Sequence, residues 1–305
     1  MEQSGFPVYV LRNDSVEVRV MPDLGARISS LVNLKTGREW MWQPPGPLHL
    51  LRNDFGDPFD CGPLVGLDEC LPTISPCSWH GISLPDHGEV WTLPWQLDEG
   101  EFEQGCIRTT VETPLTSLSF ERRLSLDNNA LILDYRLENS SDDKREFLWS
   151  LHPLLKLREG DQIELTEEVD SVLVESTKGV LGLTKGSVVD WPNPVSGVAL
   201  KRMDLGGTSG TSGAYIKLFV KLSHNGYAAI TSAQQREGLV FEFNAQENPV
   251  LGIWISRGGW NGYEHFALEP TNLPFDSLTD NDRKLFLPTL YPGEQRTWSI
   301  VMSLV

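Results

Sequence analysis

Three titratable side chains stand where each could take part in proton transfer. His87 follows Asp86 in a stretch rich in proline and glycine. His152 and Glu269 each precede a proline at the end of an apolar run. A residue before proline is held in extended geometry, so we expect both side chains at the exits of strands, where a β domain places its pocket. An imidazole and a carboxylate together could act as the acid and the base of a proton-transfer reaction.

Each of these residues, taken singly, also has an ordinary structural explanation. A lone histidine in an apolar run, such as His152, is more often a core residue with satisfied hydrogen bonds than a catalytic one. Glu269 is the stronger candidate, because a carboxylate in the sequence Ala-Leu-Glu-Pro would be costly to bury without a purpose.

A zinc site is an alternative use of the same region. Of the four cysteines, Cys61, Cys70 and Cys77 lie near His80 and His87 in the sequence, and Cys70, Cys77 and His80 could act as ligands. However, no Cys-x-x-Cys pair is present and the spacings are irregular. We therefore expect reduced, structural thiols and neither a metal nor a cofactor.

Composition narrows the classes of partner. The 305 residues include 25 basic and 42 acidic side chains, a formal charge of -17, which disfavours nucleic acid and anionic membrane surfaces. The first residues, MEQSGFPVYV, lack a basic segment followed by an apolar one, and no apolar window approaches the ~18 residues of a spanning helix. We expect a cytoplasmic protein, a monomer or a homodimer, whose partner is a small molecule.

The elements that must position these residues are predicted to be β-strands. Apolar and polar residues alternate with a period of two, most clearly in Leu131–Leu137, and no amphipathic stretch of convincing helical length is present. An all-β protein is therefore predicted, a large antiparallel β-sandwich in which residues 1–305 form one domain. Further strands are expected at Val8–Leu11, Val16–Met21, Ile28–Val32, Cys106–Glu112, Leu118–Leu126, Phe147–Leu157, Ser171–Glu175, Val198–Met203, Tyr215–Leu222, Tyr227–Thr231, Val240–Phe243, Leu251–Ser256, Phe266–Leu268 and Trp298–Leu304.

Residues 43–95 break this alternation. The stretch is rich in proline, glycine and aspartate and has neither a helical nor a strand period. A long irregular insertion in a compact domain usually has a function. We expect it to form one wall of a polar pocket around His87.

Five short motifs occur in order along essentially the whole chain. They are Val18–Ile28 (VRVMPDLGARI), Gly66–Pro72 (GLDECLP), Leu84–Gly88 (LPDHG), Leu151–Pro153 (LHP) and Ala267–Pro270 (ALEP). Their order and spacing resemble those of the galactose mutarotase-like superfamily, the aldose 1-epimerases. The resemblance implies a large sandwich with an acid and base pair acting on a sugar ring.

By this resemblance, Glu269 would take the proton from the anomeric hydroxyl while His152 protonates the ring oxygen, which opens the hemiacetal. Rotation next to the aldehyde and reclosure would then give the other anomer. His87 would hold a sugar hydroxyl or share the acid role. No cofactor or metal is required by this chemistry.

The resemblance also suggests residues that contact the sugar. Trp254 and Trp260 could cover the apolar face of a pyranose, although ordinary core packing is the alternative for most tryptophans. Arg257 could supply a cationic contact or be a solvated loop charge. Two further aspartates and one glutamate could bind hydroxyls, each in competition with a turn-capping role: Asp68, Glu69 and Asp86.

Departures from the family pattern bear on the substrate. Gly66–Glu69 stands where many aldose epimerases have an Asn-Arg element, and the Phe241–Asn244 segment offers no clear counterpart of an aspartate that grips sugar hydroxyls. In His87–Trp91, the arginine of hexose-6-phosphate mutarotases is absent. An unphosphorylated sugar is therefore favoured.

These observations lead to one main expectation and two alternatives. The protein is expected to be an isomerase that interconverts the α and β anomers of an unphosphorylated sugar by acid and base catalysis. A non-catalytic carbohydrate-binding or sensing protein on the same fold is the first alternative, since a fold does not fix a function. Another sugar-modifying reaction, such as that of a lyase, is the second.

Overall fold

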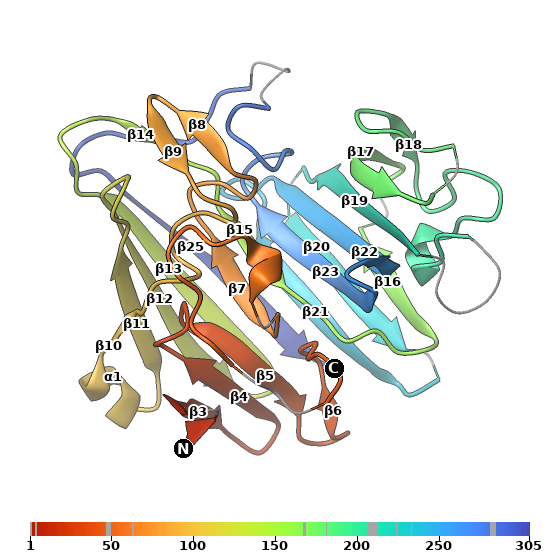
Figure 1. Cartoon of the computed structure of the whole chain (residues 1–305). Coiled ribbons are helices and arrows are strands. Elements are labelled where there is room, and N and C mark those ends of the chain that lie inside the picture. Colours follow the sequence, from red (N-terminus) through yellow and green to blue (C-terminus); the bar gives the residue numbers. More distant parts are fainter. Residues whose placement is uncertain are drawn as a thin grey trace.

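Two large antiparallel sheets form the framework of the protein (Figure 1). The computed structural model describes residues 2–3, 5–46, 50–62, 64–166, 169–180, 182–206, 213–223, 225–232, 234–280 and 285–305. The first sheet has eight strands in the spatial order β10 (Gln96–Leu97), β11 (Ile107–Glu112), β12 (Leu118–Asp127), β13 (Ala130–Asn139), β25 (Gln295–Leu304), β21 (Glu237–Asn244), β20 (Asn225–Ser232) and β16 (Asp161–Leu165).

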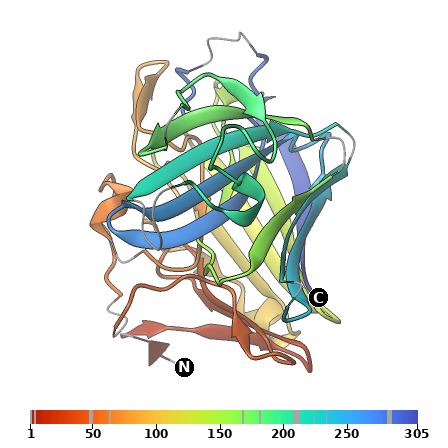
Figure 2. The same ribbon diagram turned by 90° about the vertical axis from the view of Figure 1, so that its right-hand side faces the viewer.

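The second sheet has eleven strands and carries the candidate site. Its order is β18 (Val188–Asp190), β17 (Ser171–Lys178), β19 (Ala214–Lys221), β22 (Val250–Trp260), β23 (Tyr263–Thr271), β15 (Ser150–Pro153), β7 (Leu67–Cys70), β5 (Arg27–Asn33), β4 (Val16–Met21) and β3 (Tyr9–Arg12), with β6 (Arg38–Glu39) paired to β5. The turned view of Figure 2 shows the two sheets lying over one another.

Short elements complete the described chain. They are β1 (Glu2–Gln3) with β2 (Phe6–Pro7), β8 (Cys77–Trp79) with β9 (Ile82–Leu84), β14 (Arg145–Glu146) with β24 (Thr289–Leu290), the 3-10 turns Phe59–Cys61 and Leu200–Arg202, and α1 (Glu99–Glu103). Within the ranges given above, no helix is long and apolar enough to cross a membrane.

The core lies between the two sheets because each strand turns its apolar residues to the same side. On β19, Ile216 and Leu218 are opposite Ile255 and Ile253 of β22. These residues belong to one buried apolar cluster with residues of the other sheet such as Leu133. Side chains alternate across a strand, so the residues between them in sequence point to the outer face of the second sheet.

The predicted all-β antiparallel sandwich is confirmed, and Val16–Met21 forms a strand with the predicted bounds. Two strand predictions were wrong in detail. Val198–Met203 contains the 3-10 turn Leu200–Arg202 instead of a strand, because a short apolar run has no period that separates the two. In Phe147–Leu157 only Ser150–Pro153 is a strand, and it ends at a proline, which has no N–H to donate.

Residues 43–95 are less irregular than their sequence suggests. They include β7, which lies inside the second sheet between β15 and β5. All four residues of β7 are buried, so the strand shows no alternation of apolar and polar residues. The other described parts of this stretch are the 3-10 turn Phe59–Cys61, the β8–β9 hairpin and loops, one of which places His87 at the outer face of the same sheet.

Candidate functional site

Strand register brings the acid and base candidates together. Ser150 of β15 is opposite Thr271 of β23, so two residues further along His152 faces Glu269. Nε2 of His152 lies 4.0 Å from Oε1 of Glu269. Gly252 of β22 is opposite Glu269, and a Cβ atom there would lie 3.0 Å from Oε2 of Glu269. The missing side chain therefore leaves room for the carboxylate.

His152 and Glu269 line a pocket of about 210 Å³ on the outer face of the second sheet. Strands supply one side of it and the loops of residues 43–95 supply another. The residues around it are Phe59, Ile74, Ser75, His87, His152, Leu154, Ser176, Tyr215, Lys217, Trp254, Trp260, His265, Glu269 and Asp276.

A buried lysine joins two carboxylates in this pocket. Nζ of Lys217 lies 2.5 Å from Oε2 of Glu269 and 3.3 Å from Oδ1 of Asp276. Burial alone would lower the pKa of Lys217, but the charges of Asp276 and Glu269 outweigh it and raise this pKa. Burial raises the pKa of Glu269, and the ammonium group of Lys217 opposes this shift. Oε1 of Glu269 is buried and accepts no hydrogen bond from any described residue, and Glu269 is among the residues that line the pocket.

His152 is held as a neutral imidazole. Its pKa lies well below the ordinary 6.5, first because of burial and then because of the positive charges of His87 and Lys217. Its Nδ1 atom is buried and has no hydrogen-bond partner within the described chain. An imidazole of this kind can donate or accept a hydrogen bond, but it carries little positive charge at neutral pH.

The loop conformation presents His87 to the pocket. The backbone N–H of His87 donates to the carbonyl of Ile74, and His87 itself has a φ of 57°. Gly88 follows with a φ of 76°, and a Cβ there would lie 2.1 Å from the carbonyl oxygen of Leu71, so only glycine allows this close approach. The imidazole of His87 stacks on Phe59 at 3.9 Å between ring centroids.

Asp86 fixes the orientation of His87. Oδ1 of Asp86 lies 2.9 Å from Nδ1 of His87, and Oδ2 accepts a hydrogen bond from the backbone N–H of Phe59 at 2.8 Å. Burial alone would raise the pKa of Asp86, but the hydrogen bond from His87 and its charge outweigh it and lower this pKa. Since Nδ1 is engaged, Nε2 of His87 is the nitrogen that can exchange a proton with a ligand.

Aromatic side chains form the opposite wall. Trp254 packs against Tyr215 with ring centroids 4.9 Å apart, and Trp260 stacks on His265 at 5.5 Å. His265 is almost fully buried, and burial lowers its pKa to about 4. A wall of flat, largely apolar rings beside a few polar groups suits the C–H face of a sugar.

Four residues predicted to contact a substrate do not line this pocket. Glu69 lies on the core side of β7, where its carboxylate accepts hydrogen bonds from Arg122 (2.9 Å), Tyr135 (2.8 Å) and Trp149 (3.0 Å). Its neighbour on β7, Asp68, is buried against Nε of Arg27 at 2.7 Å. Both carboxylates hold arginines in place, because adjacent residues of a doubly buried strand must each find a partner.

The other two, Asp86 and Arg257, also lie outside the set of lining residues. Asp86 contacts His87 and the backbone of Phe59, and so supports the pocket instead of lining it. Nε of Arg257 lies 3.5 Å from Glu264 at the end of the β22–β23 pair, outside the set of lining residues. Neither residue supplies a charge to the pocket surface.

The proposed zinc ligands do not come together either. Nε2 of His80 lies 2.8 Å from Glu146, and Sγ of Cys77 lies 3.7 Å from the hydroxyl of Thr73. Cys70 is buried on β7 in an apolar cluster against which Cys77 packs. Among the described residues, Cys70, Cys77 and His80 do not form a group of converging metal ligands.

Sequence reasoning missed nine of the fourteen lining residues, and those with an aromatic or titratable side chain are Phe59, Tyr215, Lys217, His265 and Asp276. The signal for Lys217 was present, because Tyr215 and Lys217 are two apart in a strand whose intervening residues are apolar. A lysine in such a strand normally faces solvent, so the pattern alone did not single it out.

Neither a family model nor a curated relative matches the sequence. Solved structures, in contrast, match the chain over nearly its whole length. A galactose mutarotase-related enzyme of Lactobacillus acidophilus has a TM-score of 0.68 at 18% identity, over 98% of this chain and 97% of that chain. A protein of Escherichia coli K12, provisionally assigned as an aldose 1-epimerase, has a TM-score of 0.71 at 15% identity, over 99% of both chains.

A third solved structure agrees with these two. A galactose mutarotase-like protein of Clostridium acetobutylicum has a TM-score of 0.67 at 16% identity, over 100% of this chain and 96% of that chain. The protein therefore has the galactose mutarotase-like fold that its motifs indicated. At these sequence identities the structural similarity establishes the fold but not the activity, which must be argued from the chemistry of the pocket.

Proposed function

We propose that this protein is a mutarotase-like isomerase that interconverts the anomers of a neutral, unphosphorylated monosaccharide by acid and base catalysis. One observation carries the proposal. In a pocket with a tryptophan wall, the free oxygen of the Glu269 carboxylate lies 4.0 Å from Nε2 of His152. A base and a hydrogen-bond donor at this separation can reach the two oxygens attached to one anomeric carbon.

The reaction requires two proton transfers and no net redox change. Oε1 of Glu269 takes the proton from the anomeric hydroxyl, and the electron pair left on that oxygen forms the carbonyl bond. The bond between the anomeric carbon and the ring oxygen breaks, and the ring oxygen receives a proton. Rotation about the adjacent carbon–carbon bond and the reverse sequence then give the other anomer.

The proton donor differs from the first expectation. A histidine whose pKa is well below 6.5 is scarcely protonated at neutral pH, so His152 is a poor general acid. We assign His152 to a hydrogen bond with the ring oxygen and assign delivery of the proton to Nε2 of His87. The carboxylate of Asp86 at Nδ1 supports a transient positive charge on that ring.

Charge and size support a neutral monosaccharide. Lys217 is the single lysine or arginine among the described residues around the pocket, and two carboxylates already contact it. A phosphate group would therefore find no unpaired cation there. The volume of about 210 Å³ is smaller than the roughly 300–1,000 Å³ of pockets for drug-sized ligands and suits one sugar ring.

A second candidate, a non-catalytic carbohydrate receptor, is favoured by one observation. The ammonium group of Lys217 contacts the candidate base at 2.5 Å, which reduces the tendency of Glu269 to take a proton. A receptor needs only the tryptophan wall and polar groups of this pocket. Binding without exchange of anomers would favour this second candidate.

Anomeric exchange measured by NMR saturation transfer tests both candidates. The purified protein is compared with Glu269→Gln over neutral aldoses, uronic acids and hexose phosphates. The proposal expects faster exchange of one or more neutral aldoses with the wild type, and no acceleration with the variant. Acceleration that survives in Glu269→Gln, or is confined to phosphates, would overturn it.

A further inference from the structure

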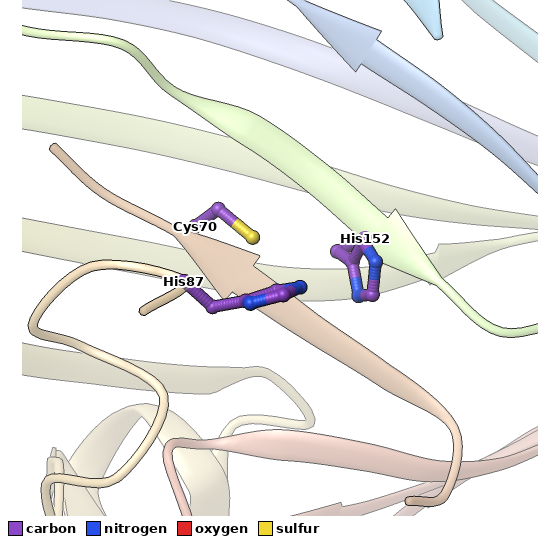
Figure 3. Close-up of side chains that lie close together, drawn as sticks. All are labelled: Cys70, His87 and His152. Atoms are coloured by element: carbon purple, nitrogen blue, oxygen red, sulfur yellow. The ribbon is translucent and has the colours of Figure 1, made fainter. Parts of the chain in front are cut away.

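Cys70 is a thiol beside the pocket that the proposed reaction does not use. It is fully buried at the end of β7, opposite Ser150 of β15. Strand alternation directs its side chain to the same side of the sheet as His152. Figure 3 shows Cys70, His87 and His152 directed toward one common space from three separate segments of the chain.

The potential ligand atoms of these three residues converge. Sγ of Cys70 and one nitrogen of each histidine all lie within 4.8 Å of one another. Bond lengths of about 2.3 Å to sulfur and 2.0–2.1 Å to nitrogen in a tetrahedral zinc site correspond to ligand separations of roughly 3.3–3.6 Å. A movement of about 1 Å of the two ligating imidazole nitrogens toward a common centre would therefore be enough to reach this geometry.

The surroundings resemble those of a metal ligand set in two respects. Oδ1 of Asp86 lies 2.9 Å from Nδ1 of His87, and Asp86 is itself fixed by the N–H of Phe59. Carboxylates commonly orient metal-binding histidines in this way. Nδ1 of His152 is buried, and no described residue hydrogen-bonds to it. His152 thus has a ring nitrogen that no described protein group occupies.

A metal ion must displace the proton of the Cys70 thiol. Burial is the main cause that raises the pKa of this thiol well above its ordinary value, and the charge of Glu269 adds to the effect. The three residues leave a fourth position, which the open side of the pocket can fill with a water. Three protein ligands with one open position are typical of accessible zinc sites.

We propose that Cys70, His87 and His152 bind a thiophilic divalent cation such as Zn²⁺, and that this cation switches the pocket off. One thiolate and two imidazoles select zinc and its neighbours over Mg²⁺ or Ca²⁺. Bound metal occupies the imidazole lone pairs and displaces the sugar. The metal is an inhibitor here and takes no part in the isomerisation; this consequence rests on the proposed function, whereas binding does not.

Cobalt(II) spectroscopy tests the binding directly. Metal-free, reduced full-length protein is titrated with Co²⁺. We expect visible bands of tetrahedral cobalt and a thiolate-to-cobalt charge-transfer band that saturate at one equivalent. Cys70→Ser should remove the charge-transfer band, and His87→Asn should weaken cobalt binding at least tenfold. Cys77→Ser, which changes a cysteine outside the cluster, should leave the spectrum unchanged.

Circular dichroism of Cys70→Ser shows whether the charge-transfer band is lost because the ligand is gone or because the protein is unfolded. His87 is partly exposed, so His87→Asn tests cobalt binding independently of the buried Cys70. Failure to saturate near one equivalent, or a charge-transfer band that persists in Cys70→Ser, would overturn the inference. In an activity assay, one equivalent of Zn²⁺ should suppress anomeric exchange, and a chelator should restore it.

The two proposals fail separately. A protein that binds cobalt through Cys70 but exchanges no sugar keeps the metal site and loses the proposed function. A protein whose exchange is indifferent to Zn²⁺ and whose cobalt spectrum lacks the thiolate band keeps the function and loses the metal site.

Discussion

Lys217 and Glu269 form an ion pair that leaves half of the carboxylate free. Nζ of Lys217 lies 2.5 Å from Oε2 of Glu269, whereas Oε1 points toward His152. The pair is buried, so the lysine favours the ionised form that a general base must have, against the effect of burial. The same contact fixes the side on which Glu269 meets a sugar.

Replacement of the lysine should move the acid limb of the pH–rate profile. In Lys217→Met the pKa of Glu269 should rise further, because burial is no longer opposed by a nearby cation. Activity is lost as pH falls through the pKa of the base, so the limb of kcat/KM should shift to higher pH. The profile of anomeric exchange against pH measures this shift.

The controls for Lys217→Met separate charge from fold. In Lys217→Met the buried carboxylate of Glu269 loses its partner, which should also lower the free energy of unfolding by about 3–5 kcal/mol. Lys217→Arg retains the charge and should keep the acid limb near its original pH. Lys221→Met, at the exposed end of β19, should change stability by less than about 0.5 kcal/mol and leave the profile unaltered. An unshifted limb in Lys217→Met would contradict the role.

The two histidines should respond differently to substitution. His87→Asn removes the proposed proton donor and should lower kcat by about 10² or more. His152→Asn keeps a hydrogen-bond donor near the ring oxygen, so its loss in kcat should be smaller than that of His87→Asn. Anomeric exchange at saturating sugar measures both. The reverse order would return the acid role to His152.

Gly252 should be required for the position of the base. A Cβ atom at this residue would lie 3.0 Å from Oε2 and 3.1 Å from Cβ of Glu269, so the carboxylate must shift by a few tenths of an ångström. We expect Gly252→Ala to reduce kcat by about tenfold, since catalysis is sensitive to small misplacement. Gly100→Ala in α1, where the added atom makes only an ordinary contact, should retain full activity.

His265 should make stability depend on pH. Burial lowers its pKa from 6.5 in the unfolded chain to about 4 in the fold. Between these pH values the unfolded state binds more protons than the folded state. The free energy of unfolding is therefore undiminished above pH 6.5 and decreases as pH falls toward 4. A difference of about 2.5 pKa units corresponds to roughly 3 kcal/mol.

Denaturant unfolding at several pH values measures this contribution. His265→Phe should keep the aromatic contact with Trp260 and flatten the decline of stability between pH 6.5 and 4. His80→Phe, which replaces an exposed histidine, should leave the slope of stability against pH largely unchanged. Equal slopes for wild type and His265→Phe would contradict the prediction.

The sequence alone determined the class of fold and singled out three residues that line the candidate site, His87, His152 and Glu269. Alternation of apolar and polar residues predicted strands such as Val16–Met21, because side chains of a strand point to opposite faces. His152 and Glu269 could be singled out because each is a titratable residue before a proline in an otherwise apolar run. His87 stood out in a loop too polar to be core.

Only the tertiary structure decided which polar residues reach the pocket. Asp68 and Glu69 are neighbours in a strand that is buried on both faces, so no alternation indicated that Glu69 would face Arg122 in the core. The pairing of Lys217 with Glu269 joins β19 to β23 across β22, which no spacing in the sequence encodes. Strand order and register set these contacts, and both depend on interactions between residues far apart in the chain.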